Sequence, residues 1–398
     1  MRHLAIGLIV FMLATTVTAV PPVQSFLKDG KLKDAMVAYA NPSNDGEKFS
    51  LGLLQVLDAV QTFSLGFQQL GIRPELASSG IPFFRVITPG PSTGPVQTAT
   101  PEKVAALFSG LKAGLEKANL TLQSTGAADF SVELVLDEAR LDFNGNEKVE
   151  ESETLMRAFG RFLQIRARSK PDEPLRIRFD SADAAWLEGY THLVVGMLDL
   201  LTAYDWLPVW DQCAHQLFQR PDPIPPIAEV LGPEVGFDRF FDYIAAIHDM
   251  RLPLVDQEGP ARARDRFLQM IASSRLCWER TLAESDDDHE WLPNPDQTGP
   301  NGAKITAAQI EGWERVLDEM EAVAKGEKLM PHPRFKAGLG MNVEALVNQP
   351  PELDLVLWIQ GSALVPYVEK GDVSNAERWR QLTQPFGGRF MMFALWSN

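Results

Sequence analysis

Oxygen-bearing side chains recur at alternate positions in one short acidic segment of the chain, residues 142–153. Asp142, Asn144 and Asn146 occupy the first, third and fifth positions of this segment, and Glu153 occupies the twelfth. Carboxylate and amide oxygens are the ligands that hard cations such as Ca²⁺ prefer. Alternate spacing lets these oxygens converge on one ion while the chain turns around it. The segment therefore predicts a cation site.

The other ligand positions of the segment complete the expected shell. Lys148 at position seven offers its backbone carbonyl, and Glu150 at position nine binds directly or through water. Val149 between them is apolar, so we expect it to hold the loop against the core. With these residues the segment resembles an EF-hand calcium loop. The resemblance implies Ca²⁺ as the ligand, bound by Asp142, Asn144, Asn146, Lys148, Glu150 and Glu153.

Two residues of the segment depart from the EF-hand pattern. Glu147 stands at the sixth position, where the family has Gly because the turn needs a positive φ, and this costs about 1 kcal/mol of strain. Thr154 follows the loop where an apolar residue is usual. Few of the ligands are charged, so we expect weak binding, with a Kd of roughly 10⁻⁴ to 10⁻³ M. A solvated acidic turn without an ion is the alternative, because Asn-Gly is a common turn pair.

A second acidic run, residues 284–290, holds five carboxylates and His289. Its composition allows another cation, with His289 as a transition-metal ligand, but its spacing fits no ligand pattern. The other interpretation is a surface loop that pairs with nearby arginines. Both acidic segments contribute to a formal net charge of −16, which disfavours nucleic acid as a partner.

Three ionisable residues share one stripe of an apolar helical pattern over residues 182–205. Glu188 and His192 are four residues apart, and Asp199 follows on the same side. Such a stripe suits a metal-assisted hydrolase, in which His192 works as an acid or base. The alternative is a core histidine that one carboxylate satisfies. The sequence has no GxSxG, HExxH or P-loop motif, so we assign no catalytic residue and do not favour an enzyme.

The first nineteen residues have the pattern of a cleaved signal peptide. A basic start is followed by an apolar run over residues 4–14 and by small residues at 17–19. We therefore expect an exported protein, periplasmic or secreted, with no membrane span in the mature chain. Export would expose Cys213 and Cys277 to oxidising conditions, which favours a disulfide. Both cysteines also lie on apolar faces of helical patterns, so two buried free thiols are the alternative.

Most of the chain shows helical periodicity interrupted by Pro and Gly. We expect helices over residues 44–70, 100–118, 153–167, 182–205, 208–218, 235–250, 260–284, 306–325 and 374–384. Residues 132–136 and 175–179 alternate as strands do, which predicts a short two-stranded element. The fold class is therefore mainly α, a multi-helical body with one EF-hand-like loop.

The expected organisation places the loop between two helical regions. Residues 20–128 form an N-terminal helical region, residues 129–180 carry the loop, and residues 181–398 form a C-terminal helical region. The three regions can also form one integrated body. Because EF-hands pair, Asp180 and Asp183 are candidates for a degenerate second loop, although both also suit a helix N-terminus.

The interpretation that best covers these features is an exported protein with a low-affinity, structural calcium site. A helical interaction scaffold without an ion is one alternative, and the hydrolase is the other. Calcium is the expected ligand and cofactor, and a protein partner is left open.

Overall fold

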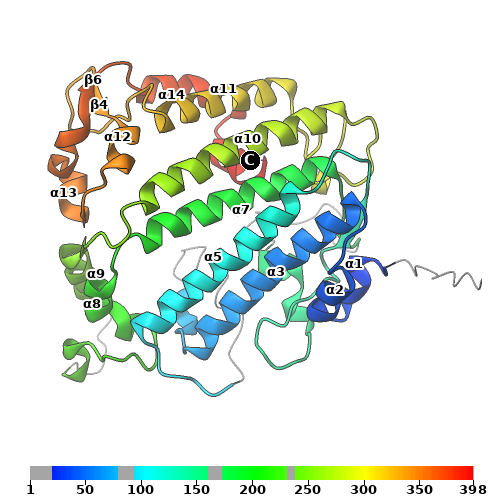
Figure 1. The fold of residues 1–398 in the computed structure, drawn as a ribbon, viewed down its shortest axis with the longest axis horizontal. Coiled ribbons are helices and arrows are strands. Elements are labelled where there is room, and N and C mark those ends of the chain that lie inside the picture. The colour runs from blue at the N-terminus through cyan, green and yellow to red at the C-terminus, as the bar shows by residue number, and fades with distance from the viewer. Residues whose placement is uncertain (1–19, 79–93, 160–172, 231–237, 398) are drawn as a thin grey trace, which may run out of the picture.

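Long helices dominate the computed structural model, which describes residues 20–78, 94–159, 173–230 and 238–397. The mainly α fold class predicted from the sequence is confirmed (Figure 1). The predicted signal peptide, residues 1–19, lies outside the described residues. The long helices are α3 (Asp45–Gln69), α5 (Pro101–Gln123), α7 (Ser181–Thr202), α10 (Gly259–Ala283) and α11 (Ala307–Ala324).

The long helices begin where local sequence can satisfy their first N–H groups. The side chain of Asn44 accepts a hydrogen bond from the N–H of Glu47 at the start of α3. Thr100 caps α5 in the same way, and Pro101 follows it at the first helical position. Asp180 caps α7, and the Asp183 carboxylate accepts a hydrogen bond from the Asp180 N–H.

Helices α3, α5, α7 and α10 lie side by side and form the body of the molecule (Figure 1). Close packing of α7 on α10 depends on small residues. A Cβ added at Gly196 would lie 3.1 Å from the Ala263 carbonyl oxygen. One core cluster runs from Val23 to Leu292 and contains residues from all three sequence regions.

Shorter elements surround this body. The short helices are α1 (Val23–Lys28), α2 (Leu32–Ala38), α6 (Leu155–Phe159), α8 (Leu207–Leu217), α9 (Asp238–Asp249), α12 (Val343–Asn348), α13 (Leu355–Gln360), α14 (Ala376–Thr383) and α15 (Phe390–Ser397). The helix expected over residues 153–167 is described only as α6, and residues 160–167 lie outside the described residues.

The strands form three small antiparallel sheets. They are β1 (Val132–Val135) with β2 (Arg176–Phe179), β3 (Arg251–Leu252) with β5 (Leu353–Asp354), and β4 (Leu339–Met341) with β6 (Val368–Lys370). The first pair is the two-stranded element that the sequence predicts, with Leu134 opposite Ile177. Both of these side chains are buried, and they fasten the loop-bearing segment to the core.

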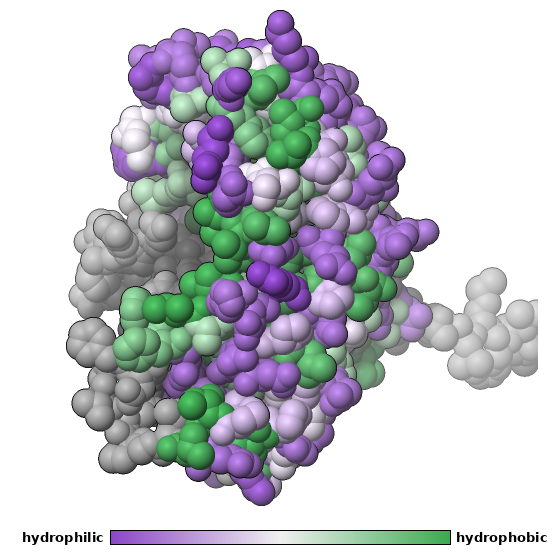
Figure 2. All heavy atoms as spheres, turned by 90° about the vertical axis from the view of Figure 1, so that its left-hand side faces the viewer, coloured by the Kyte–Doolittle hydropathy of each residue, from purple (hydrophilic) through white to green (hydrophobic). Residues whose placement is uncertain are grey.

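One side of the molecule exposes apolar side chains. Figure 2 shows hydrophobic groups among polar ones on the face where α8, α9 and α13 lie in Figure 1. The exposed apolar residues of α9 are Phe240, Phe241, Tyr243, Ile244 and Ile247. Within the described part of the chain, no helix is both long and apolar enough to cross a membrane.

Candidate metal centre

The loop of residues 142–153 lies between strand β1 and helix α6. A turn at residues 136–139 leads into it, so the approach is not the helix that precedes an EF-hand loop. The two flanks of the loop pair with each other: Leu141 N–H donates to the Glu153 carbonyl, and Leu155 N–H donates to the Ala139 carbonyl. The loop is therefore closed at its base by backbone hydrogen bonds.

The first ligand position, Asp142, organises the turn. One oxygen of its carboxylate accepts hydrogen bonds from the N–H groups of Gly145 and Asn146, at 2.7 and 3.3 Å, and the other accepts from Glu147 N–H at 2.9 Å. A carboxylate has about four acceptor directions, so one direction is left for a cation.

The two asparagines repeat this pattern along the loop. Asn144 Oδ1 accepts from Asn146 N–H at 3.0 Å, and Asn146 Oδ1 accepts from Lys148 N–H at 2.8 Å. These bonds tie the two asparagine side chains to the backbone of the loop.

Glu153 and Glu150 close the far end of the loop. Glu153 is 5% exposed, and one of its oxygens accepts from the N–H groups of Phe143 and Asn144. Its other oxygen accepts from Glu150 N–H at 3.0 Å, in a reciprocal capping box. Burial is the main cause that raises the pKa of Glu153, and the charge of Asp142 adds to it. Positions one and twelve of the loop therefore lie near each other.

Two glutamines of helix α3 form hydrogen bonds with the backbone of the loop. Gln61 Nε2 donates to the Asp142 carbonyl at 2.7 Å, and Gln68 Nε2 donates to the Phe143 carbonyl. The Phe143 side chain is 2% exposed and belongs to the main core cluster. The loop is thus anchored to helix α3 and to the core, while Gly145, Glu147, Lys148 and residues 150–152 are exposed.

The donor chemistry of the loop fits a hard cation, because every candidate ligand is an oxygen. The three carboxylates of Asp142, Glu150 and Glu153 do not lie within 4.8 Å of one another as a group. Position nine often binds through water, so a direct approach by Glu150 is not required. Three of the acceptor directions of Glu153 are engaged by N–H groups, so ligation by both oxygens must displace at least one of these bonds.

The sixth residue of the loop adopts the backbone conformation that the sequence predicts. Glu147 has φ 61°, in the left-handed region that favours glycine. We expect Glu147→Gly to stabilise the protein by about 0.5–1 kcal/mol, because glycine enters this region without strain. Urea unfolding measures the change. Glu147→Gln is the matched control, since it removes the same charge and keeps the strain; an equal gain in both variants would show that charge, and not strain, is the cause.

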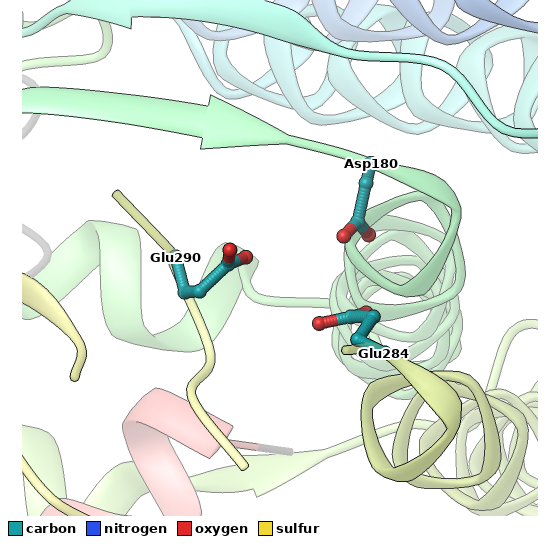
Figure 3. A group of neighbouring side chains, drawn as sticks. All are labelled: Asp180, Glu284 and Glu290. Atoms are coloured by element: carbon teal, nitrogen blue, oxygen red, sulfur yellow. The ribbon is translucent and has the colours of Figure 1, made fainter. Parts of the chain in front are cut away.

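A second group of carboxylates lies at the end of α10. Asp180 stands before α7, Glu284 follows α10, and Glu290 belongs to the loop after α10, and their side chains point toward one another (Figure 3). One oxygen of each lies within 4.8 Å of the others. Among the described residues, no other group of three His, Cys, Asp or Glu ligand atoms meets this distance.

Each carboxylate of this acidic cluster is held by a neighbouring donor. Ala182 N–H donates to Asp180, Gln297 Nε2 to Glu284, and Asp288 N–H to Glu290. Glu290 is 5% exposed. Burial, together with the charge of Asp180, raises the pKa of Glu290 to about 7 and that of Glu284 to about 9.

Two arginines line the same cavity of about 450 Å³ as the acidic cluster. Arg178 forms an ion pair with Asp288, and Arg280 donates to the Ser181 carbonyl at 2.6 Å. The raised pKa values of Glu290 and Glu284 favour their protonated, neutral forms, which lowers the negative charge of the cluster. The sequence offers arginine pairing as one interpretation of residues 284–290. Asp288 forms such a pair, with Arg178.

The idea of a degenerate second EF-hand loop at Asp180 and Asp183 is wrong. Both residues form the capping box of α7, and strand β2 pairs with β1 and not with the loop. The acidic cluster has no signature in the local sequence, because Asp180 and Glu290 are more than a hundred residues apart in the chain.

The Glu188, His192 and Asp199 stripe lies inside the helical body. His192 is 1% exposed, and its Nε2 lies 3.4 Å from Glu188 Oε1. Asp199, also 1% exposed, forms ion pairs with Lys112 at 2.7 Å and Arg262 at 3.2 Å. His192 is thus enclosed beside Glu188, which is the arrangement that the core-histidine interpretation predicts.

Both cysteines are free and buried in the structure. Cys213 lies in α8, and Cys277 lies near the end of α10, so the disulfide left open by the sequence is not formed. Burial raises the pKa of Cys213 to about 11 and also raises that of Cys277. Both thiols therefore stay protonated at neutral pH and pack as small apolar groups.

No family model matches the chain, and no curated protein or solved structure is significantly similar to it. The fold and the loop define the chain only as a multi-helical protein that carries one closed, oxygen-rich loop.

Proposed function

We propose that the protein binds Ca²⁺ weakly in the loop of residues 142–153, and that the ion has a structural role. The observation that carries this proposal is the closed turn around Asp142. Its carboxylate gathers three N–H groups, and Glu147 takes the left-handed conformation at position six. A plain acidic turn does not require this conformation at a glutamate.

The hydrogen bonds that the ligand side chains already form support a weak affinity for Ca²⁺. Glu153 must release at least one N–H bond to bind with both oxygens, and its raised pKa adds competition from protons. Metal binding requires ionised carboxylates, so affinity should fall in acid. A Kd of roughly 10⁻⁴ to 10⁻³ M is consistent with these costs. Such a site suits the exported location that the sequence predicts for the chain.

Calorimetric titration of the protein with CaCl₂ tests the proposal. We expect one saturable site in the wild type, and no binding in the Asp142→Ala/Glu153→Gln double variant. Asn146→Asp adds charge at a ligand position and should tighten binding about fivefold to tenfold. This variant tests the site even if the double variant fails to fold.

Glu290→Gln is the matched control, because it removes a carboxylate from the acidic cluster and leaves the loop intact. It should bind Ca²⁺ as the wild type does. Binding that survives the loop variant and disappears in Glu290→Gln would move the ion to the acidic cluster and overturn the proposal. Absence of binding in the wild type and in Asn146→Asp would also overturn it.

The interaction scaffold is the alternative that one observation favours, namely the exposed apolar face of α9. It requires no ion, so the same titration separates it from our proposal.

A further inference from the structure

The hairpin of α1 and α2 packs directly against the segment that carries the loop. Val23 and Leu27 of α1 are 2% and 0% exposed and belong to the main core cluster. Gln24 Oε1 accepts from Val135 N–H at 2.9 Å, and the Leu27 carbonyl accepts from Arg140 N–H at 2.9 Å. The hairpin is therefore held by the residues that lead into the loop.

The turn between the two helices touches the loop itself. Gly30 has φ +70°, and a Cβ added to it would lie 2.2 Å from Cγ1 of Val149. Val149 is the eighth residue of the loop and lies between two ligand positions, Lys148 and Glu150. Its side chain thus fills the space that only glycine leaves at the turn.

Backbone pairing links the far end of the loop to the hairpin as well. Ala139 and Leu141 pair with the chain on either side of Thr154, and Arg140 between them donates its N–H to the hairpin. A change in the position of Glu153 during ligation acts on this pairing, because the Glu153 carbonyl accepts from Leu141 N–H. The hairpin is therefore connected to the proposed ion at both ends of the loop.

From these contacts we infer that Ca²⁺ in the loop tightens the docking of the α1–α2 hairpin on the helical body, and that removal of the ion loosens it. This inference rests on the proposed function. Binding that favours the closed loop also favours the docked hairpin, because Val149 contacts Gly30 and Arg140 N–H donates to the Leu27 carbonyl in this loop conformation. The coupling is reciprocal, so a loosened hairpin weakens the affinity for Ca²⁺.

Amide hydrogen exchange of the full chain, with saturating CaCl₂ or with EGTA, tests the coupling. We expect the amides of residues 23–40 to exchange about fivefold or more slowly with Ca²⁺. Peptides from α11, which packs against α10, α12 and α14, serve as the internal control and should not change.

Val149→Ala is the variant that separates the inference from the proposed function. It keeps every ligand and removes the contact with Gly30. It should still bind Ca²⁺ at one site, weakened by no more than about the factor by which the ion slows hairpin exchange in the wild type, because the coupling is reciprocal. The response of the hairpin to the ion should be lost or much reduced. Wild-type binding without slower exchange in residues 23–40, or an unchanged response in Val149→Ala, would overturn the inference and leave the calcium site standing. No binding at all would overturn both.

Discussion

The free energy of unfolding should fall as the pH rises from about 5 to about 9, because the acidic cluster at the end of α10 must then ionise. Glu290 and Glu284 have raised pKa values, about 7 and about 9, in the folded chain. The folded state thus binds protons that the unfolded state has released, and stability is lost as pH passes from the unfolded pKa to the folded one. For Glu290 alone the loss is roughly 2–3 kcal/mol.

Glu290→Gln should remove the part of this loss that comes from Glu290, whereas the part that comes from Glu284 should remain. Glutamine still accepts the hydrogen bond from Asp288 N–H and carries no charge, so the variant should match the wild type at pH 5 and exceed its stability by about 2 kcal/mol at pH 9. Urea unfolding in EGTA at several pH values measures both profiles. Glu352→Gln, at an exposed position, is the control and should leave the profile unchanged. Parallel profiles for Glu290→Gln and the wild type would contradict the role of the cluster.

Gly30→Ala should destabilise the protein by about 2–4 kcal/mol, from two causes that add. Alanine is strained at φ +70°, and its Cβ would overlap the side chain of Val149. Thermal or urea unfolding measures the loss. Gly338→Ala separates the two causes, because Gly338 has φ +78° and no atom lies within 4 Å of the added Cβ. It should cost only about 1–2 kcal/mol.

The double variant Gly30→Ala/Val149→Ala tests the overlap directly. Removal of two methyl groups from Val149 makes room for the new Cβ, so the double variant should be more stable than the sum of the two single effects predicts. Strict additivity would show that Gly30 and Val149 do not press on each other.

Local sequence patterns were sufficient to predict most of the helices and the first pair of strands. The start of α3 at Asn44 and of α5 at Thr100 follows from capping, which involves only neighbouring residues. Alternation over residues 132–136 and 175–179 predicts the two strands. Strand β2 alternates in burial as expected, whereas the last two residues of β1 are both buried. The approach to the loop differs from that of an EF-hand, because it runs through strand β1 and a turn and not through a helix.

The candidate sites divide in the same way. Residue types and spacing single out Asp142 and Glu153, and the resemblance to an EF-hand loop implies the left-handed conformation of Glu147, because a tight turn is a local structure. The sequence could not show that Val149 lies on Gly30, that Glu290 is buried beside Asp180, or that His192 is enclosed. Each of these depends on contacts between segments far apart along the chain. The sequence by itself thus determined the helical body and the oxygen-rich loop. The tertiary structure decided the hairpin contact, the raised pKa values of Glu284 and Glu290 and the burial of the histidine, since packing fixes distance and desolvation together.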